Sequence, residues 1–264
     1  MDRDAVLARF DARLRRDARP DTAGAVVERA GDVVRQVGAP GDWNGVLWSD
    51  LDPAGADAAI AETIHRYATL GLDFEWKWYA HDRPADLPDR LRAAGFEPDE
   101  QEALMVAEVS SLLSTVDVPP GVELRPVTDE AGVDAAVAVH ETAFGSPGAR
   151  LRHQMLAQLA GRPDTVVAVL ATASGKPVSA ARMELHEATG FASLWGGGTV
   201  PAWRGRGIYR SLVAHRARIA ADRGYEYLQV DASDDSRPIL ARLGFAQLSA
   251  TRPFHYRTAA RPPA

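Results

Sequence analysis

The sequence contains no cysteine. Disulfide bonds, thiolate metal sites and a cysteine nucleophile are therefore excluded, and a reducing cytoplasm is the expected location. No apolar run approaches the roughly 20 residues that cross a membrane, and the first residues, MDRDAVLARFDARLRRD, carry too much charge for a signal peptide. A basic excess is missing too, because the formal net charge is −6. We expect no membrane partner, no nucleic-acid partner and no bound metal.

The composition that remains is that of an ordinary globular protein, with 46% hydrophobic and 25% charged residues. A chain of 264 residues accommodates one large or two ordinary domains. Such a chain can bury a substantial core, and we expect a monomer or a homodimer.

The most informative stretch runs from Leu194 to Gly224. A glycine-rich apolar run predicts a strand, Pro201 predicts a turn, and a basic glycine loop from Arg204 to Gly207 precedes an amphipathic helix. The loop falls where the first helical amides have no partner within the helix, and such amides attract anions. A pyrophosphate suits this loop, although a short glycine-arginine sequence is also found in plain turns.

The chain continues with a predicted strand, residues 225–232, and a short helix within residues 234–245 that ends at a glycine. With this continuation, residues 121–257 resemble the GNAT superfamily of acyl-CoA-dependent N-acyltransferases. Its signature is Q/R-x-x-G-x-G/A after the fourth strand and LGF after the fifth. Arg204, Gly207 and Leu243-Gly244-Phe245 match the signature, whereas Tyr209 stands where the family has Gly or Ala.

The resemblance implies an α/β (α+β) fold: a mixed, mostly antiparallel sheet flanked by helices, with its fourth and fifth strands splayed apart. It implies acetyl-CoA as co-substrate, with the pantetheine arm along the fourth strand and the pyrophosphate on the loop amides. The coenzyme-binding residues that it implies are Gly198, Thr199, Val200, Arg204, Gly205, Arg206, Gly207, Ile208, Tyr209, Arg210 and Ser233.

Acyl transfer to an amine requires a neutral amine, a donor for the developing oxyanion and a proton for the thiolate. A backbone amide of the fourth strand can polarise the carbonyl. Tyr209 is the candidate acid at the loop. The candidate bases are Glu184 and His186 on the third strand and the pair His140-Glu141 on the first helix, with ordinary surface roles as the alternative. Trp195 is a candidate for lining the acceptor pocket.

Two departures from the family pattern affect the predicted activity. Leu240 occupies the position of a tyrosine often assigned as the acid, and Ser233 replaces a frequent asparagine. We expect an N-acetyltransferase that moves an acetyl group directly from acetyl-CoA to a primary amine of a small acceptor. The alternative is a non-catalytic acyl-CoA-binding regulatory or scaffolding protein.

Residues 44–96 and 191–245 share one order of predicted elements: strand, turn, helix, glycine, strand, short helix and Gly-Phe. This self-similarity predicts tandem copies of one fold, with chance similarity as the alternative. The turn at residues 52–57 carries Asp52 and Asp57 in place of the basic loop, and these carboxylates would repel a pyrophosphate. We therefore expect a degenerate GNAT-like domain at 1–115 and the acetyl-CoA-binding domain at 116–264.

The remaining expectations come from hydrophobic periodicity and turn residues. Helices are expected at 4–17, 57–70, 85–94, 130–144 and 150–159. Strands are expected within 24–37 (two) and at 44–51, 73–79, 101–109 (closing the first domain), 122–126, 165–172, 177–185 and 190–200. Residues 110–121 are expected to form a linker.

Overall fold

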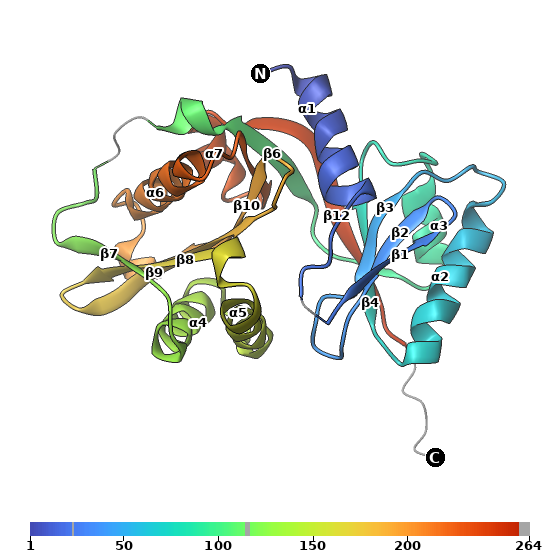
Figure 1. The fold of residues 1–264 in the computed structure, drawn as a ribbon, viewed down its shortest axis with the longest axis horizontal. Helices are drawn as coiled ribbons and strands as arrows, with labels where there is room; N and C mark the ends of the chain where they lie inside the picture. Colours follow the sequence, from blue (N-terminus) through green and yellow to red (C-terminus); the bar gives the residue numbers. More distant parts are fainter. Residues whose placement is uncertain (23, 114–116, 259–264) are drawn as a thin grey trace, which may run out of the picture. The chain divides into compact units, whose positions relative to one another are not determined.

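The computed structural model describes residues 1–22, 24–113 and 117–258, which form two compact units (Figure 1). The N-terminal unit comprises Asp2–Leu104, Asp231–Arg237 and the chain from Gln247. The C-terminal unit comprises Met1, Met105–Val230 and Pro238–Ala246. The expected boundary between residues 115 and 116 lies outside the described residues, so the division into domains 1–115 and 116–264 stays a prediction. The units themselves are not contiguous in sequence.

The N-terminal unit combines helices with a mixed sheet. Its elements are α1 (Arg3–Phe10), a π-helical segment (Asp11–Arg16), β1 (Val26–Ala30), β2 (Val33–Val37), β3 (Gly45–Ser49), α2 (Ala56–Leu70), β4 (Phe74–Tyr79), α3 (Leu87–Ala93), β5 (Glu97–Pro98) and β12 (Ala246–Tyr256). The strand order is β1-β2-β3-β4-β12, and β5 pairs with β12. Among the described pairings of these strands, only β3 with β4 is parallel.

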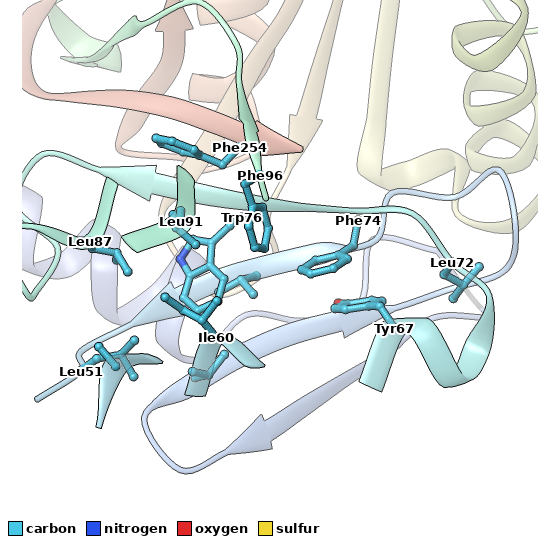
Figure 2. Packing of buried hydrophobic residues seen from close by; sticks show 13 residues of the cluster. Leu51, Ile60, Tyr67, Leu72, Phe74, Trp76, Leu87, Leu91, Phe96 and Phe254 are labelled. Carbon is cyan, nitrogen blue, oxygen red and sulfur yellow. The ribbon is translucent and has the colours of Figure 1, made fainter. Parts of the chain in front are cut away.

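The core of this unit is built from aromatic side chains (Figure 2). Trp76 is fully buried on β4, and the ring of Phe74 stacks on that of Tyr67 of α2 at 4.1 Å between centroids. Phe96 contacts the rings of Phe74 and Trp76 edge-on. Phe254 of β12 is also fully buried in this core, although it comes from the end of the chain.

The C-terminal unit has helices on both faces of its sheet. Its elements are β6 (Glu102–Glu108, from Met105), β7 (Val122–Pro126), α4 (Glu130–Phe144), α5 (Ala149–Gly161), β8 (Val166–Ala173), β9 (Lys176–Leu185), β10 (Phe191–Thr199), α6 (Ile208–Asp222), β11 (Tyr227–Ala232, to Val230) and α7 (Arg237–Arg242, from Pro238). Short 3₁₀ turns span Val109–Leu112, Pro163–Thr165 and Pro201–Trp203. The strand order is β6-β11-β10-β9-β8-β7, which confirms the mixed, mostly antiparallel sheet.

Successive side chains along each strand point to opposite faces of this sheet, so each face has its own core. Val133 and Val137 of α4 pack with Leu170 and Ala180 on one face, which α5 also covers. Ile208 of α6 packs on the opposite face, as Figure 1 shows. No helix in the described part of the chain is both long and apolar enough to span a bilayer.

The closing strands differ from the sequence-based expectation. The strand expected at 101–109 is present as β6, and its residues are divided between the two units, with Met105 onward in the C-terminal unit. The N-terminal unit is closed instead by β12, which pairs antiparallel with β4 from Thr251 to Tyr256. Burial of Phe254 against Trp76 and Phe96 holds β12 there. Sequence periodicity did not predict this strand.

Because Phe254 is fully buried in the N-terminal core, Phe254→Ala should lower the free energy of unfolding by about 3–5 kcal/mol. Denaturant titration of the full chain measures the change. The side chain of the neighbouring His255 is 46% exposed and lies 3.3 Å from Asp99, which is exposed too, so the control His255→Ala should cost less than about 1 kcal/mol. Equal, small effects of both substitutions would show that β12 does not close this core.

Candidate functional site

The two parallel strands of the C-terminal unit diverge along their length. β10 and β11 pair from Phe191 with Tyr227 to Ser193 with Gln229, and their described pairing ends there. β10 nevertheless runs on to Thr199, still paired with β9, and β11 runs on to Ala232. The inner edges of the two strands therefore part, which confirms the predicted splay. An unpaired strand edge accepts an extended ligand by backbone hydrogen bonding.

A β-bulge lies on β10 beside this gap, where the register with β9 shifts between Trp195 and Gly198. Gly196 has a φ of 56°, in the left-handed region that favours glycine. A Cβ on Gly197 would lie 2.6 Å from the Tyr209 ring, and one on Gly198 would lie 2.7 Å from a ring carbon of Phe144. The three glycines therefore allow the bulge to form between α4 and α6.

At the end of β10, backbone groups alternate between the side of β9 and the side of the gap. The Val200 amide donates to the Val178 carbonyl at 3.0 Å, and the Gly198 carbonyl accepts from Ser179 Oγ at 2.7 Å. Both residues therefore bond on the side of β9. Alternation turns the backbone of Thr199 toward the gap. Of the three residues predicted to pair with pantetheine, Thr199 is the one with its backbone at the gap edge.

Arg204 takes part in the fold at the end of β10. Its Nε donates to the Thr199 carbonyl at 3.0 Å and its Nη2 to the Ala143 carbonyl at 2.7 Å. Ala143 lies in the last turn of α4, where carbonyl groups lack helical partners and a cation is favourable. The predicted phosphate-binding arginine thus ties β10 to the C-terminus of α4.

The loop that follows forms an amide cradle at the start of α6. Gly205 and Gly207 have φ of 74° and 85°, and Gly207 caps the helix without a side-chain bond. Within the described residues, none of the backbone amides from Gly205 to Arg210 donates a hydrogen bond. The guanidinium of Arg206 lies over the Trp203 ring, 4.4 Å from its centroid. Free amides with nearby guanidinium groups form an anion site.

Two of the predicted coenzyme-binding residues, Ile208 and Ser233, have side chains that are not part of the amide cradle. Ile208 is buried and packs in the core beneath α6. Ser233 is exposed at the end of β11, within the N-terminal unit, and its carbonyl accepts the amides of Ser236 and Arg237. It lines a hollow with Gln101 and three carboxylates, Glu100, Asp234 and Asp235.

Tyr209 lies on the α6 face, directly against the bulge. It is half-buried, and its ring fills the space beside Gly197. Burial raises the pKa of the phenol, and the nearby Arg216 charge lowers it by less. The hydroxyl therefore keeps its proton at neutral pH and can donate it.

The candidate bases lie on the opposite face. Alternation along β9 places Arg182 and Glu184 on the side of α5, where Gln158 contacts both, and His186 follows directly after the strand. Glu184 Oε1 accepts from Gln158 Nε2 at 2.8 Å and lies 3.5 Å from Arg182 Nη2. In the described ranges, no group of three or more His, Asp or Glu side chains is placed to hold a metal ion.

His186 belongs to a polar chain where β10 and β11 part. Its Nε2 lies 2.7 Å from Ser193 Oγ, and that hydroxyl donates to Gln229 Oε1 at 2.7 Å. Because the serine proton is used, Nε2 must carry the hydrogen in the first bond. Burial lowers the pKa of His186, while Glu184 raises it by less. His186 is therefore neutral at pH 7, and its Nε2 cannot accept a proton.

His140 lies on α4 one turn before Phe144, whose ring meets Gly198. Its Nε2 is 3.1 Å from Ser146 Oγ, and its buried Nδ1 has no hydrogen-bond partner in the described chain. Burial lowers the pKa of His140, Glu141 raises it, and the Arg182 charge lowers it.

Sequence reasoning named Glu184, His186 and His140 as candidates but did not name the polar residues around them. Arg182, Gln158, Ser193 and Gln229 complete the polar face that the structure assembles. The alternation of three polar residues at 182, 184 and 186 on a predicted strand was the available signal for Arg182. No local pattern indicated that α5 or β11 supplies the others.

In the N-terminal unit, β3 and β4 also pair in parallel over a short stretch, and a side chain of the same unit, Arg15, bonds to the backbone beside them. β3 and β4 pair in parallel through only two residue pairs, and β3 has a bulge at Leu47 against β2. Arg15, 3% exposed, donates to the Leu47 carbonyl at 3.0 Å and to Asp82 and Asp11 at 2.7 Å each. The backbone of this bulge is therefore already hydrogen-bonded to Arg15, from the π-helical segment.

The Arg182 charge opposes protonation of His140, so Arg182→Gln should raise the His140 pKa. NMR titration of labelled imidazoles, with His140→Gln for assignment, measures the midpoint. Arg218 acts on His215 instead, so the control Arg218→Gln should raise only the His215 midpoint. An unchanged His140 midpoint in Arg182→Gln would mean that the two side chains do not interact.

Comparisons with known proteins agree with this geometry. The model of the acetyltransferase (GNAT) family matches residues 134–245. A GCN5-related N-acetyltransferase from Kribbella flavida superposes with a TM-score of 0.67 at 19% identity, over 91% of each chain. Another from Sphaerobacter thermophilus gives 0.61 at 15% identity, over 90% of this chain and 83% of that chain.

A tandem GNAT protein from the clavulanic acid biosynthesis pathway gives a TM-score of 0.60 at 12% identity, over 92% of this chain and 85% of that chain. At such identities the likeness concerns the fold alone. The comparison with curated proteins gave no match. Residues 134–245 are therefore a match to the GNAT acetyltransferase family, and the chain as a whole shares its fold with structures of GNAT proteins, a tandem one among them.

Proposed function

We propose that the protein transfers an acetyl group from acetyl-CoA to a primary amine. The observation that carries this proposal is the coincidence of two features at one strand end: β10 parts from β11 beside a bulge, and the same chain then enters a cradle of free amides at the start of α6. An extended thioester arm suits the first feature and a pyrophosphate suits the second.

The residues at the cradle fit the coenzyme. Positive φ at Gly205 and Gly207 turns successive amides outward, and the absence of Cβ atoms admits close approach of a phosphate. Arg206 and Arg210 supply charge there. Arg204 contributes through its bonds to Thr199 and α4, which hold the strand end beside the loop. The coenzyme supplies the activated acyl group when bound.

The proposed chemistry uses the two faces of β10 for two proton transfers. The acceptor amine loses a proton to Glu184, and its nitrogen bonds to the acyl carbon as the carbon–sulfur bond breaks. Backbone amides at the bulge stabilise the developing oxyanion. Tyr209, on the other face, returns a proton to the thiolate. His186, Ser193 and Gln229 hold the strands where they part.

We propose that the N-terminal unit is a degenerate GNAT-like copy that does not bind acetyl-CoA. Its bulge carbonyl is occupied by Arg15, which is itself paired with Asp82. The turn before α2 carries Asp52 and Asp57 where a pyrophosphate needs donors; Asp57 is paired with Arg90 at 2.9 Å. A single coenzyme site per chain follows from these contacts.

Reversing the loop charge tests the coenzyme site. Arg206→Glu with Arg210→Glu should weaken acetyl-CoA binding by about 100-fold or more, because each lost charge-assisted contact contributes roughly 1.5–3 kcal/mol. Calorimetry should show one site per chain in the native protein. Arg218→Glu, an exposed change farther along α6, should alter affinity less than about threefold. Equal affinities in the native protein and the double variant, or two sites per chain, would contradict the proposal.

Thiol release from acetyl-CoA with a panel of primary amines tests the reaction itself. In that assay Tyr209→Phe should lower kcat by about tenfold or more, since proton donation to the leaving group contributes roughly 10²–10⁴ in rate. Acetyl-CoA affinity should stay within about twofold, because the ring is retained, and the alkaline limb of the pH profile should be lost. An unaltered rate and profile would make Tyr209 a packing residue. Tight coenzyme binding without thiol release would favour a non-catalytic binding protein.

A further inference from the structure

We propose that the acceptor is an amino acid, whose carboxylate is held by Arg182 and His140 on the α4/α5 face of the C-terminal sheet. This inference rests on the proposed acyl transfer for the fate of the amine. The carboxylate site itself is argued from the hydrogen-bond deficit of the two side chains.

Arg182 is a buried cation without adequate partners. Its side chain is 10% exposed, and its buried Nε has no hydrogen-bond partner in the described chain. Nη1 lies 3.4 Å from Gln158 Oε1 and Nη2 lies 3.5 Å from Glu184 Oε1. Charge-assisted bonds from arginine are normally about 2.7–2.9 Å long. The shorter bond to Glu184 comes from Gln158 instead, at 2.8 Å.

Other buried arginines of this chain are well satisfied. Arg216 is 1% exposed and donates to the carbonyls of Leu212 at 3.1 Å and Arg182 at 2.7 Å. Arg15 makes bonds of 2.7, 2.7 and 3.0 Å. Leaving a buried charge uncompensated is strongly destabilising. Among the buried arginines of the described chain, Arg182 is therefore the one whose Nε has no partner, and an anion supplied from outside would complete its bonding.

His140 shows the same deficit on the same face. In the described part of the C-terminal unit, the buried side-chain nitrogens and oxygens without a hydrogen-bond partner are His140 Nδ1 and Arg182 Nε. The Arg182 charge acts on the imidazole, which is neutral at pH 7. The proposed carboxylate site uses the tautomer in which Ser146 Oγ, 3.1 Å from Nε2, donates to that nitrogen and the proton is on Nδ1. In that tautomer His140 and Arg182 each offer an unpaired N–H group to a carboxylate oxygen.

A carboxylate bound by Arg182 and His140 would lie close to the residues proposed for acyl transfer. Arg182 is opposite Trp195 in the β9–β10 register, and Trp195 is 38% exposed at the bulge. Glu184, the proposed base, is two residues along β9 on the same face. A carboxylate at Arg182 and an amine at Glu184 fit one small molecule that carries both groups on neighbouring atoms. A polycationic acceptor would instead place positive charge against Arg182.

Acetyl transfer to L-amino acids and to their C-terminal amides tests the inference. We expect the free acid of a good acceptor to exceed its amide by about 10- to 100-fold in kcat/KM, the effect of one charge-assisted contact. Arg182→Gln should abolish the preference, mainly through KM, while acetyl-CoA affinity is retained. The matched charge change Arg218→Gln should preserve it. His140→Gln should reduce the preference without removing it.

A second measurement does not depend on turnover. Propionate, 3-phenylpropionate and succinate, which are amino acids without the amine, should bind the native protein and Arg218→Gln in ligand-observed NMR but not Arg182→Gln. Arg182-dependent binding without thiol release from any amine would support the carboxylate site and contradict the acyl transfer. Thiol release with equal use of acids and amides, or binding of these acids unchanged in Arg182→Gln, would overturn the inference while leaving the transferase intact.

Discussion

The site depends on the end of one parallel strand pairing. β10 and β11 stop pairing after Ser193 and Gln229, at a point held by hydrogen bonds from His186 through Ser193 to Gln229. A sheet edge in the interior of a unit is normally covered, because unpaired backbone groups are costly. Here the bulge on β10 turns the strand away and leaves an edge that an extended ligand can pair with. The glycine run 196–198 is the local requirement for this geometry. Larger residues at 197 and 198 would collide with Tyr209 and Phe144, and position 196 has a positive φ.

The same strand separates two chemical environments. The α6 face presents Tyr209, whose phenol burial keeps protonated, next to the amide cradle. The α4/α5 face presents a cation, a carboxylate and two neutral histidines. The candidate proton donor, Tyr209, and the candidate base, Glu184, thus lie on opposite faces of a single layer of strands. Acyl transfer uses both functions, one for the leaving thiolate and one for the incoming amine.

The N-terminal unit repeats the arrangement with a different outcome. β3 and β4 also pair in parallel over a short stretch, and β3 also has a bulge, but Arg15 is bonded to the bulge carbonyl and to Asp82. Its core depends in turn on β12, because Phe254 packs with Trp76 and Phe96. The strand that closes this unit therefore comes from the far end of the sequence.

Local sequence determined most of the elements and the identity of the loop. Helix 130–144 and strand 122–126 have the predicted bounds, because apolar periodicity and turn residues act within a few positions. The signature Arg204, Gly207 and Leu243-Gly244-Phe245 was sufficient to predict the GNAT family match at residues 134–245 and the splayed strands. What distant segments contribute had no local signal. Only the tertiary structure could assign β12 to the N-terminal core, direct Arg204 to backbone carbonyls, and leave Arg182 Nε and His140 Nδ1 without a hydrogen-bond partner in the described chain. Each of these depends on residues far apart in sequence that folding brings into contact.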